Sequence, residues 1–229
     1  MEPGEPLDIR PDDQRWGHSF GPGAGTVNLH YITSGRGRTP LVLLHGWPGF
    51  WYDWRHVIPR LQFDASLIAP DLRGFGDSDK PDLPPSEGYT PEVLADDVLA
   101  LMDHVGFERA VVAAHDLGAT VAQTLARRAP DRVAALVLFN PPYPGIGMRR
   151  FDPAAQAELW YQHLHAQPWA DRLIGYELGT VDLYVRGMYE HWVGRHERLR
   201  EAELEWIVQF YARPGAIRGS LAYYRARAG

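Results

Sequence analysis

Short apolar runs alternate with longer amphipathic segments over the first 140 residues of the chain. The runs that predict strands are 27–33, 41–44, 67–69, 110–113 and 134–139. Two segments between them, 91–105 and 117–129, carry apolar residues at helical spacing. Continuously apolar runs suit strands buried on both faces, and strands that alternate with helices indicate right-handed crossovers. The pattern therefore predicts an α/β fold, with a mostly parallel sheet and helices on both of its faces.

The pattern changes after Asn140. The run Pro-Pro-Tyr-Pro-Gly at 141–145 breaks regular structure, and no convincing β run follows it. The segments that predict helices in this part are 153–167, 170–176, 181–192, 201–212 and 214–224, which are rich in Trp and Tyr. We therefore predict two parts: a core over 1–140, and a helical cap over 141–229 that covers the strand ends where open α/β folds bind ligands.

Composition narrows the classes of partner. The chain has 229 residues, 45% of them hydrophobic, no cysteine and a formal net charge of -6. A chain with a net negative charge does not attract the negatively charged backbone of nucleic acid. No apolar run is long enough to span a membrane. The first 16 residues lack the apolar core of a signal peptide, so we expect a cytoplasmic protein. The sequence does not decide whether the chain forms a homo-oligomer.

No pattern in the sequence predicts a metal or a cofactor. Without cysteine there are no disulfides and no thiolate ligands, and no HExxH spacing is present. His163 and His165 lie two positions apart on a predicted helix, so their side chains diverge rather than converge on an ion. We therefore expect no cofactor.

The sequence Ala-His-Asp-Leu-Gly at 114–118 lies between a predicted strand and a predicted helix. Its small residues surround a central Asp116, as in a nucleophile elbow, the tight turn that holds its central side chain clear of the backbone. A carboxylate in this position is a candidate covalent nucleophile toward saturated carbon. The alternative is an Asp that only caps the helix or stabilises the turn.

Two further segments follow predicted strands. His-Gly-Trp-Pro at 45–48 places the backbone N–H of Trp47 where it can point at a developing oxyanion, and Leu117, at the start of a helix, would donate a second N–H. Asp-Leu-Arg-Gly-Phe-Gly-Asp-Ser-Asp at 71–79 is a turn interrupted by glycines. We expect its polar side chains to hold the loop rather than to touch a substrate.

These three segments, in this order, resemble the α/β-hydrolase superfamily and, within it, the epoxide hydrolase and dehalogenase branch that uses an Asp nucleophile. The resemblance runs from about Trp16 to the end of the chain. It implies a cis peptide bond between Trp47 and Pro48. We place His45, Pro48, Trp51 and Trp160 around the pocket, and we also expect His45 and His115 to be buried, hydrogen-bonded structural histidines.

Epoxide hydrolases place two tyrosines in the cap, and their hydroxyls hold the epoxide oxygen. The resemblance assigns these roles to Tyr161 and Tyr224, with Tyr223 as the substitute for the second. The chemistry explains the pair, because two phenol donors stabilise the alkoxide that forms as an epoxide opens. Ordinary aromatic packing is the other interpretation of both residues.

Two other functions stay open. Haloalkane dehalogenases usually carry a Trp after the nucleophile, where this chain has Leu117. The segments 166–168 and 172–175 resemble the cap of fluoroacetate dehalogenases. Those enzymes, however, use arginines where this chain has Leu117 and Thr120, and a His where it has Tyr161. A non-catalytic protein that binds a small apolar ligand is the second alternative. The sequence does not specify which small apolar epoxide, or which enantiomer, would be the substrate.

The family's catalytic acid and histidine follow strands that come after the cap. This chain ends at Gly229, before either strand. Some relatives place the acid just after the strand that precedes the cap, but the residues there are Phe139, Asn140 and Pro141, none of which has a carboxylate. We therefore expect a C-terminally truncated enzyme that lacks the last strands of the fold. Its sheet should end at the strand around Val137 with an exposed apolar edge. Such a chain could be alkylated once by an epoxide but could not turn over.

Overall fold

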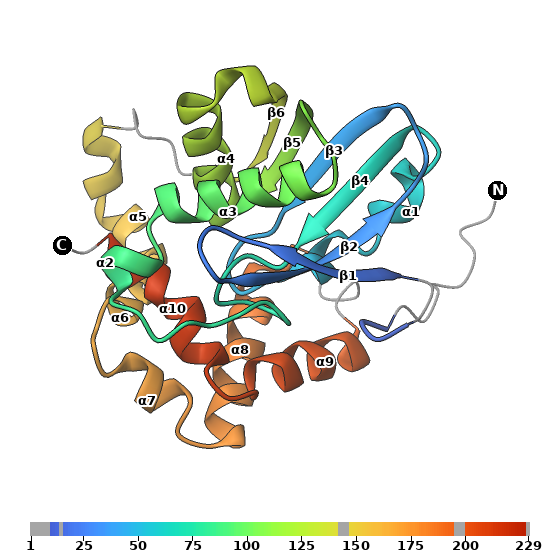
Figure 1. Cartoon of the computed structure of the whole chain (residues 1–229). Helices are drawn as coiled ribbons and strands as arrows, with labels where there is room; N and C mark the ends of the chain where they lie inside the picture. The colour runs from blue at the N-terminus through green and yellow to red at the C-terminus, as the bar shows by residue number, and fades with distance from the viewer. Residues whose placement is uncertain (1–9, 14–15, 142–146, 195–199, 228–229) are drawn as a thin grey trace.

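The computed structural model describes residues 10–13, 16–141, 147–194 and 200–227 (Figure 1). Within them the chain forms a sheet in the order β1-β2-β4-β3-β5-β6. The pairs β1/β2 and β2/β4 are antiparallel, and β4/β3, β3/β5 and β5/β6 are parallel. The strands are Gly17–Pro22, Asn28–Ser34, Thr39–Leu44, Ala65–Pro70, Ala110–His115 and Val133–Phe139. The predicted α/β fold with a mostly parallel sheet is confirmed, and β1 is an additional strand that the pattern did not predict.

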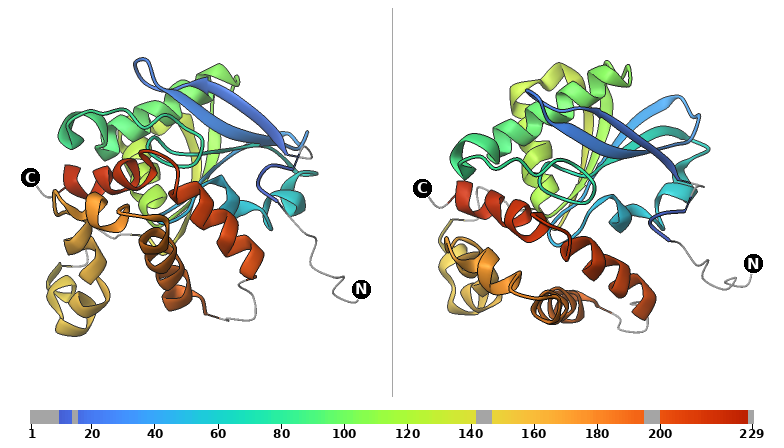
Figure 2. Two further views of the ribbon diagram at one scale, coloured as in Figure 1. Left: turned by 90° about the horizontal axis from the view of Figure 1, so that it is seen from below. Right: turned by 60° about the horizontal axis from the view of Figure 1, so that its bottom comes forward.

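Helices cover the sheet on both faces. Helices α3 (Pro91–His104) and α4 (Leu117–Arg128) pack against each other on one face, and both were predicted to within two residues (Figure 1). The short helix α1 (Ile58–Leu61) and the 3-10 turn Trp51–Trp54 lie on the other face (Figure 2). The start of helix α3 is capped, because the Thr90 side chain accepts a hydrogen bond from the Val93 N–H.

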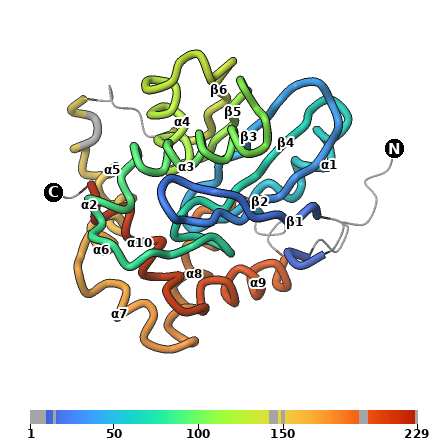
Figure 3. Tube along the Cα trace, in the orientation of Figure 1, coloured from blue at the N-terminus to red at the C-terminus, as the bar shows by residue number. Residues whose placement is uncertain are grey.

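A layer of helices lies at the carboxyl ends of the parallel strands (Figure 3). We call α5 to α10 the helical layer. The predicted helix 153–167 is in fact two helices, because the backbone at Leu159 leaves the helical region with φ -96° and ψ 10°. The members of the layer are α5 (Pro153–Glu158), α6 (Trp160–His165), α7 (Ala170–Ile174), α8 (Leu178–Trp192), α9 (Glu201–Tyr211) and α10 (Ala216–Ala226). Shorter helical segments not predicted from the sequence are α2 (Pro85–Gly88) and the 3-10 turns Pro130–Arg132 and Gly147–Phe151.

The strand β6 forms one edge of the sheet and exposes apolar side chains. Val137 is 44% exposed and Phe139 is 51% exposed, as expected for this strand. The central strands β3 and β5 are almost fully buried, so the carboxyl ends of these two strands provide a rigid platform. None of the helices in the described part of the chain is long and apolar enough to cross a membrane.

Candidate active site

Asp116 lies on a strained turn between β5 and α4. Its backbone has φ 50° and ψ -117°, a conformation that residues with a side chain rarely adopt and that concentrates at functional sites. The turn is tight because α4 begins against the backbone of β3. A Cβ built on Gly118 would lie 2.4 Å from the carbonyl oxygen of His45, so only glycine fits there. The backbone geometry is that of the predicted elbow.

Two backbone N–H groups hold the Asp116 carboxylate. The Trp47 N–H donates to Oδ1 at 3.2 Å, and the Leu117 N–H donates to the same carboxylate. The loop after β3 can approach because a Cβ on Gly46 would lie only 2.6 Å from the Cβ of Asp116. The bond between Trp47 and Pro48 is cis, as expected. The two predicted N–H donors therefore converge on the predicted nucleophile.

Burial raises the pKa of the Asp116 carboxyl above its ordinary value. The N–H groups of Trp47 and Leu117 oppose this effect, as do His115 and Arg227 to a smaller degree, because each stabilises negative charge. A carboxylate with few water neighbours is a stronger nucleophile than a solvated one, provided that it is ionised.

Tyr161 of α6 and Tyr224 of α10 meet over the side chain of Trp47. Their ring centroids are 6.1 Å apart, and each lies about 6 Å from the Trp47 ring, at 5.9 Å and 6.2 Å. Burial, with the nearby Asp116 charge second, raises the pKa of the Tyr224 hydroxyl well above its usual value, so this group stays protonated. Both side chains are buried. The adjacent Tyr223 is buried too, and its hydroxyl accepts a hydrogen bond from Arg227 at 3.3 Å.

His165, which the sequence analysis considered only as a metal ligand, is also a member of this aromatic cluster. Its side chain is fully buried, its ring lies 4.3 Å from that of Trp47, and its Nε2 is 2.8 Å from the hydroxyl of Tyr184. Burial, with Arg225 second, lowers the pKa of His165 to about 3, so the ring is neutral. The usable signal was its spacing of four residues from Tyr161, which places both on one helix face.

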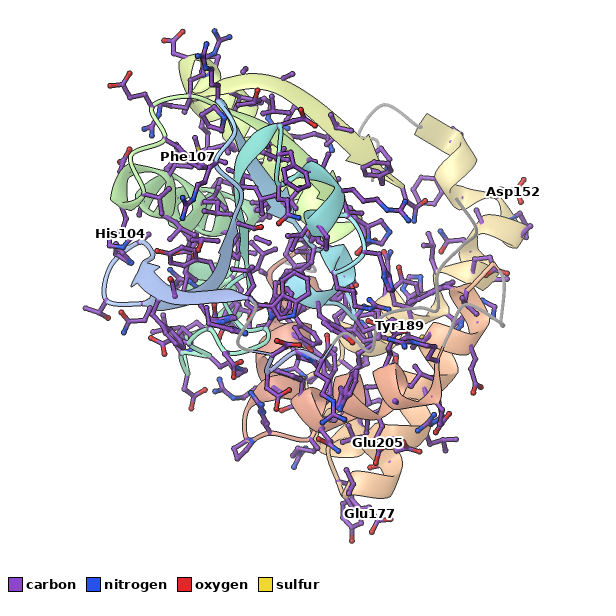
Figure 4. The ribbon with its side chains drawn as sticks, turned by 90° about the vertical axis from the view of Figure 1, so that its right-hand side faces the viewer. His104, Phe107, Asp152, Glu177, Tyr189 and Glu205 are labelled. Atoms are coloured by element: carbon purple, nitrogen blue, oxygen red, sulfur yellow. The ribbon has the colours of Figure 1, made fainter. Side chains whose placement is uncertain are left out.

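A cavity of about 510 Å³ opens beside the elbow, between the strand ends and α8. Asp116, Tyr161 and Tyr224 do not line it. In its wall, Asp53 accepts a hydrogen bond from the Tyr189 hydroxyl at 3.5 Å, and burial raises the pKa of Asp53 to about 6. Figure 4 shows Tyr189 where α8 meets the core. The wall includes Trp47, Pro48, Asp53, His115, Phe139 and Trp192.

Comparison with known proteins identifies the family. The alpha/beta hydrolase fold family matches residues 39–227. The chain belongs to this family. A soluble epoxide hydrolase from Corynebacterium sp. (strain C12) is 35% identical over 202 residues, which cover 86% of this chain and 68% of that protein. Human epoxide hydrolase 4 is 27% identical over 205 residues, which cover 87% of this chain and 56% of that protein.

Solved structures agree with this assignment. Epoxide hydrolase CorEH has a TM-score of 0.79 and 32% identity, over 92% of this chain and 73% of that chain. Epoxide hydrolase VrEH1 from Vigna radiata has a TM-score of 0.74 and 27% identity, over 92% of this chain and 71% of that chain. The chain is thus an alpha/beta hydrolase of the epoxide hydrolase-like branch. It spans 68% of the bacterial relative and little more than half of the human one.

Three residues of this hydrolase that we had placed around the pocket do not line the cavity beside the elbow. Trp51 is fully buried in the core against Trp16, and its backbone N–H donates to Asp71 at 2.8 Å. His45 is also fully buried, with Nδ1 2.9 Å from the Gly46 carbonyl oxygen and Nε2 accepting from a backbone N–H, so it is the structural histidine we expected. Trp160 lines a separate cavity of about 470 Å³ within the helical layer.

Pro48 and His115 of the hydrolase both line the cavity beside the elbow. The placement of Pro48 around a substrate pocket stays a prediction. His115 differs from the buried histidine we expected, because its side chain is only half-buried and faces the cavity rather than the core. The physical reason is that β5 ends at His115, so the side chain emerges at the rim of the sheet next to the edge strand β6.

The turn at 71–79 braces the site without entering it. The Asp71 carboxylate accepts hydrogen bonds from the N–H groups of Trp51 and Asp77 and from Nδ1 of His30. Arg73 forms a bidentate ion pair with Asp97 of α3, at 2.6 Å and 2.8 Å, and both side chains are buried. The expectation that this segment holds the loop is confirmed.

Proposed function

We propose that this chain opens small epoxides by forming a covalent ester on Asp116. The observation that carries the proposal is the convergence of two backbone N–H groups, from Trp47 and Leu117, on a half-buried carboxylate in a strained turn. The phenols of Tyr161 and Tyr224 pack on the side chain of the same Trp47, which supports their role as donors to the epoxide oxygen. The names of the relatives point to the same reaction.

In the first step an Asp116 oxygen attacks a ring carbon of the epoxide. The carbon–oxygen bond of the ring breaks, and its electron pair moves to the epoxide oxygen. Tyr161 and Tyr224 donate hydrogen bonds to that oxygen, and one of them gives it a proton, so the product is a hydroxyalkyl ester. The phenolate then recovers a proton from solvent.

The second step is hydrolysis of this ester by water. Attack on the ester carbon places a negative charge on the former carboxylate oxygen, and the N–H groups of Trp47 and Leu117 stabilise it. A base must deprotonate the water. In the described ranges the histidine–carboxylate pairs are His30–Asp71, His56–Glu203 and His191–Glu158, and none is hydrogen-bonded to Asp116. We therefore propose that the described residues carry the alkylation and that the ester accumulates.

Incubation with styrene oxide tests the first step. Intact-mass measurement should show one adduct per chain, and peptide mapping should place it on Asp116. Asp116→Asn should give no adduct, because an amide is a poor nucleophile. Tyr161→Phe and Tyr224→Phe should each slow labelling roughly 100-fold, the usual effect of losing one donor to a developing oxyanion. Tyr176→Phe is the matched control, because it removes the hydroxyl of an exposed tyrosine.

Two results would count against the proposal. A chain that is never labelled, or is labelled at another residue, would exclude Asp116 as the nucleophile. Release of diol over many turnovers by this chain alone would show that a base for the second step is present, which would exclude accumulation of the ester.

A further inference from the structure

His165 is a polar side chain in the aromatic cluster that surrounds the candidate nucleophile. Its ring lies 4.6 Å from the ring of Tyr224, 5.4 Å from that of Tyr161 and 4.3 Å from that of Trp47. None of its surface is exposed. A phenylalanine would pack equally well among aromatic rings, so packing does not explain why an imidazole is there.

One of the two imidazole nitrogens has no hydrogen-bond partner. Nε2 is 2.8 Å from the Tyr184 hydroxyl, whereas Nδ1 is buried and unpaired with respect to the described residues. The ring is also neutral, because burial lowers the pKa of His165 to about 3. A buried polar atom without a partner destabilises a protein unless a ligand completes its hydrogen bond.

The neighbouring Trp47 has a similar unpaired atom. Its indole Nε1–H is buried, and no described residue accepts a hydrogen bond from it. The Trp47 and His165 rings lie edge to face with centroids 4.3 Å apart, and both rings lie within 6.2 Å of the rings of Tyr161 and Tyr224. The mechanism proposed above uses the Trp47 backbone N–H and leaves both side-chain nitrogens without a role.

We propose that His165 and Trp47 form a polar subsite for a hydroxyl group of the substrate, which makes the preferred substrates epoxy alcohols. This inference rests on the proposed function. The indole of Trp47 can only donate, so the ligand atom must accept a hydrogen bond. Nδ1 of His165 donates or accepts according to which ring nitrogen carries the proton. A hydroxyl oxygen can accept the hydrogen bond from the Trp47 indole whichever His165 nitrogen carries the proton. The same hydroxyl can donate to Nδ1 of His165 when that atom is unprotonated, or accept from it when it is protonated.

The test uses two epoxides that differ only in the hydroxyl group, phenylglycidol and β-methylstyrene oxide. The wild-type chain should label Asp116 about tenfold faster with the alcohol at low concentration, the effect of one well-formed hydrogen bond. His165→Phe keeps the ring but removes both nitrogens, so the ratio of the two rates should fall to about that of the reaction in water. His165→Asn retains a polar atom near the Nδ1 position and should restore part of the preference.

Tyr184→Phe is the matched control, because it removes the partner of Nε2 and leaves Nδ1 in place. Tyr184→Phe should keep most of the preference for the alcohol. If His165 had a purely structural role, Tyr184→Phe and His165→Phe would change the ratio of the two labelling rates by the same amount. Circular dichroism and thermal unfolding establish that each variant is folded. An unchanged rate ratio in both His165 variants would overturn the proposal.

A binding measurement separates this inference from the proposed function. If neither epoxide labels Asp116, the proposed function fails, and calorimetry with the unreactive hydrocinnamyl alcohol and propylbenzene then tests the subsite alone. Tighter binding of the alcohol that is lost in His165→Phe supports the subsite. Equal binding of the two compounds to the wild-type chain overturns it.

Discussion

Asp116 is held before reaction by the same two N–H groups that would receive the oxyanion after it. The donors of Trp47 and Leu117 belong to the loop after β3 and to the first turn of α4 and already contact the carboxylate, so no group has to move between the two steps. Such preorganised donors are the largest single contribution to catalysis in many enzymes. The arrangement has a cost, because partial burial raises the pKa of this carboxylate.

This cost predicts that Asp116→Asn stabilises the folded chain at neutral pH. The folded pKa of Asp116 lies above its unfolded value, so folding is penalised once the unfolded carboxyl ionises. The penalty is absent only well below the unfolded pKa of about 4, where both states are protonated, and grows as pH rises toward the folded pKa. Unfolding temperatures of the two proteins should coincide in acid, and the variant should unfold at the higher temperature at pH 7. The exposed Asp131→Asn serves as control; equal midpoints throughout the pH range would contradict the argument.

At this scale the sequence predicted the residues whose role follows from backbone geometry. Asp116, Trp47 and Leu117 come together because a strand, a tight turn and a helix fix their positions. Residues whose role depends on where a side chain points were harder to place. Trp51 follows the same loop as Trp47, yet it packs into the core, because the 3-10 turn that starts there points its ring toward Trp16.

Several polar contacts attach the helical layer to the core, and α9 makes a buried one. Oε1 of Glu203 accepts hydrogen bonds from Arg55, which follows the 3-10 turn of the core, at 3.0 Å and from Arg200 at 2.9 Å. Only 1% of the Glu203 side chain is exposed. These partners lower the pKa of Glu203 to about 2 despite its burial.

Glu203→Gln should therefore weaken the attachment of α9. At pH 7 we expect the free energy of unfolding to fall by about 2 to 3 kcal/mol, because two arginines lose their buried counter-charge. The difference should shrink as pH falls below about 4.5, where the unfolded carboxyl takes up a proton and the wild-type advantage is lost. Urea unfolding at several pH values measures both effects. Glu205→Gln on the exposed side of the same helix should change little (Figure 4), and an equal loss in both variants would contradict the prediction.

Elements with a strong apolar period were predicted from the sequence, and weakly patterned ones were not. The helices α3 and α4 and the strands β2 to β6 were found within a few residues. The strand β1 reads Gly-His-Ser-Phe-Gly-Pro, which has little intrinsic preference for extended structure, and its pairing with β2 forms it. The residues on both sides of Leu159 favour a helix, so the sequence gives no sign of the break between α5 and α6. We attribute this break to the packing of the two helices onto the core.

On the scale of the whole molecule, the exposed edge of β6 predicts self-association. Unpaired backbone groups and apolar side chains on an edge strand provide a template for another strand. We expect sedimentation velocity to show association that increases with concentration, and Val137→Lys to reduce it without changing the rate at which Asp116 is labelled. Leu83→Lys, which alters an exposed leucine away from the sheet, should leave association unchanged. Association that is insensitive to Val137→Lys would place the contact on another surface.

The hydrogen bond from Trp47 to Asp116 joins residues 69 positions apart. The strands that carry them, β3 and β5, pair over a similar distance, with Leu41 beside Val111. Such pairing forms slowly because a long loop must close first. During synthesis on the ribosome β3 emerges well before β5, so the elbow and its N–H donors can only meet once both are outside the exit tunnel. A nascent chain in which β3 and β5 have not yet paired would therefore lack the two N–H donors at Asp116.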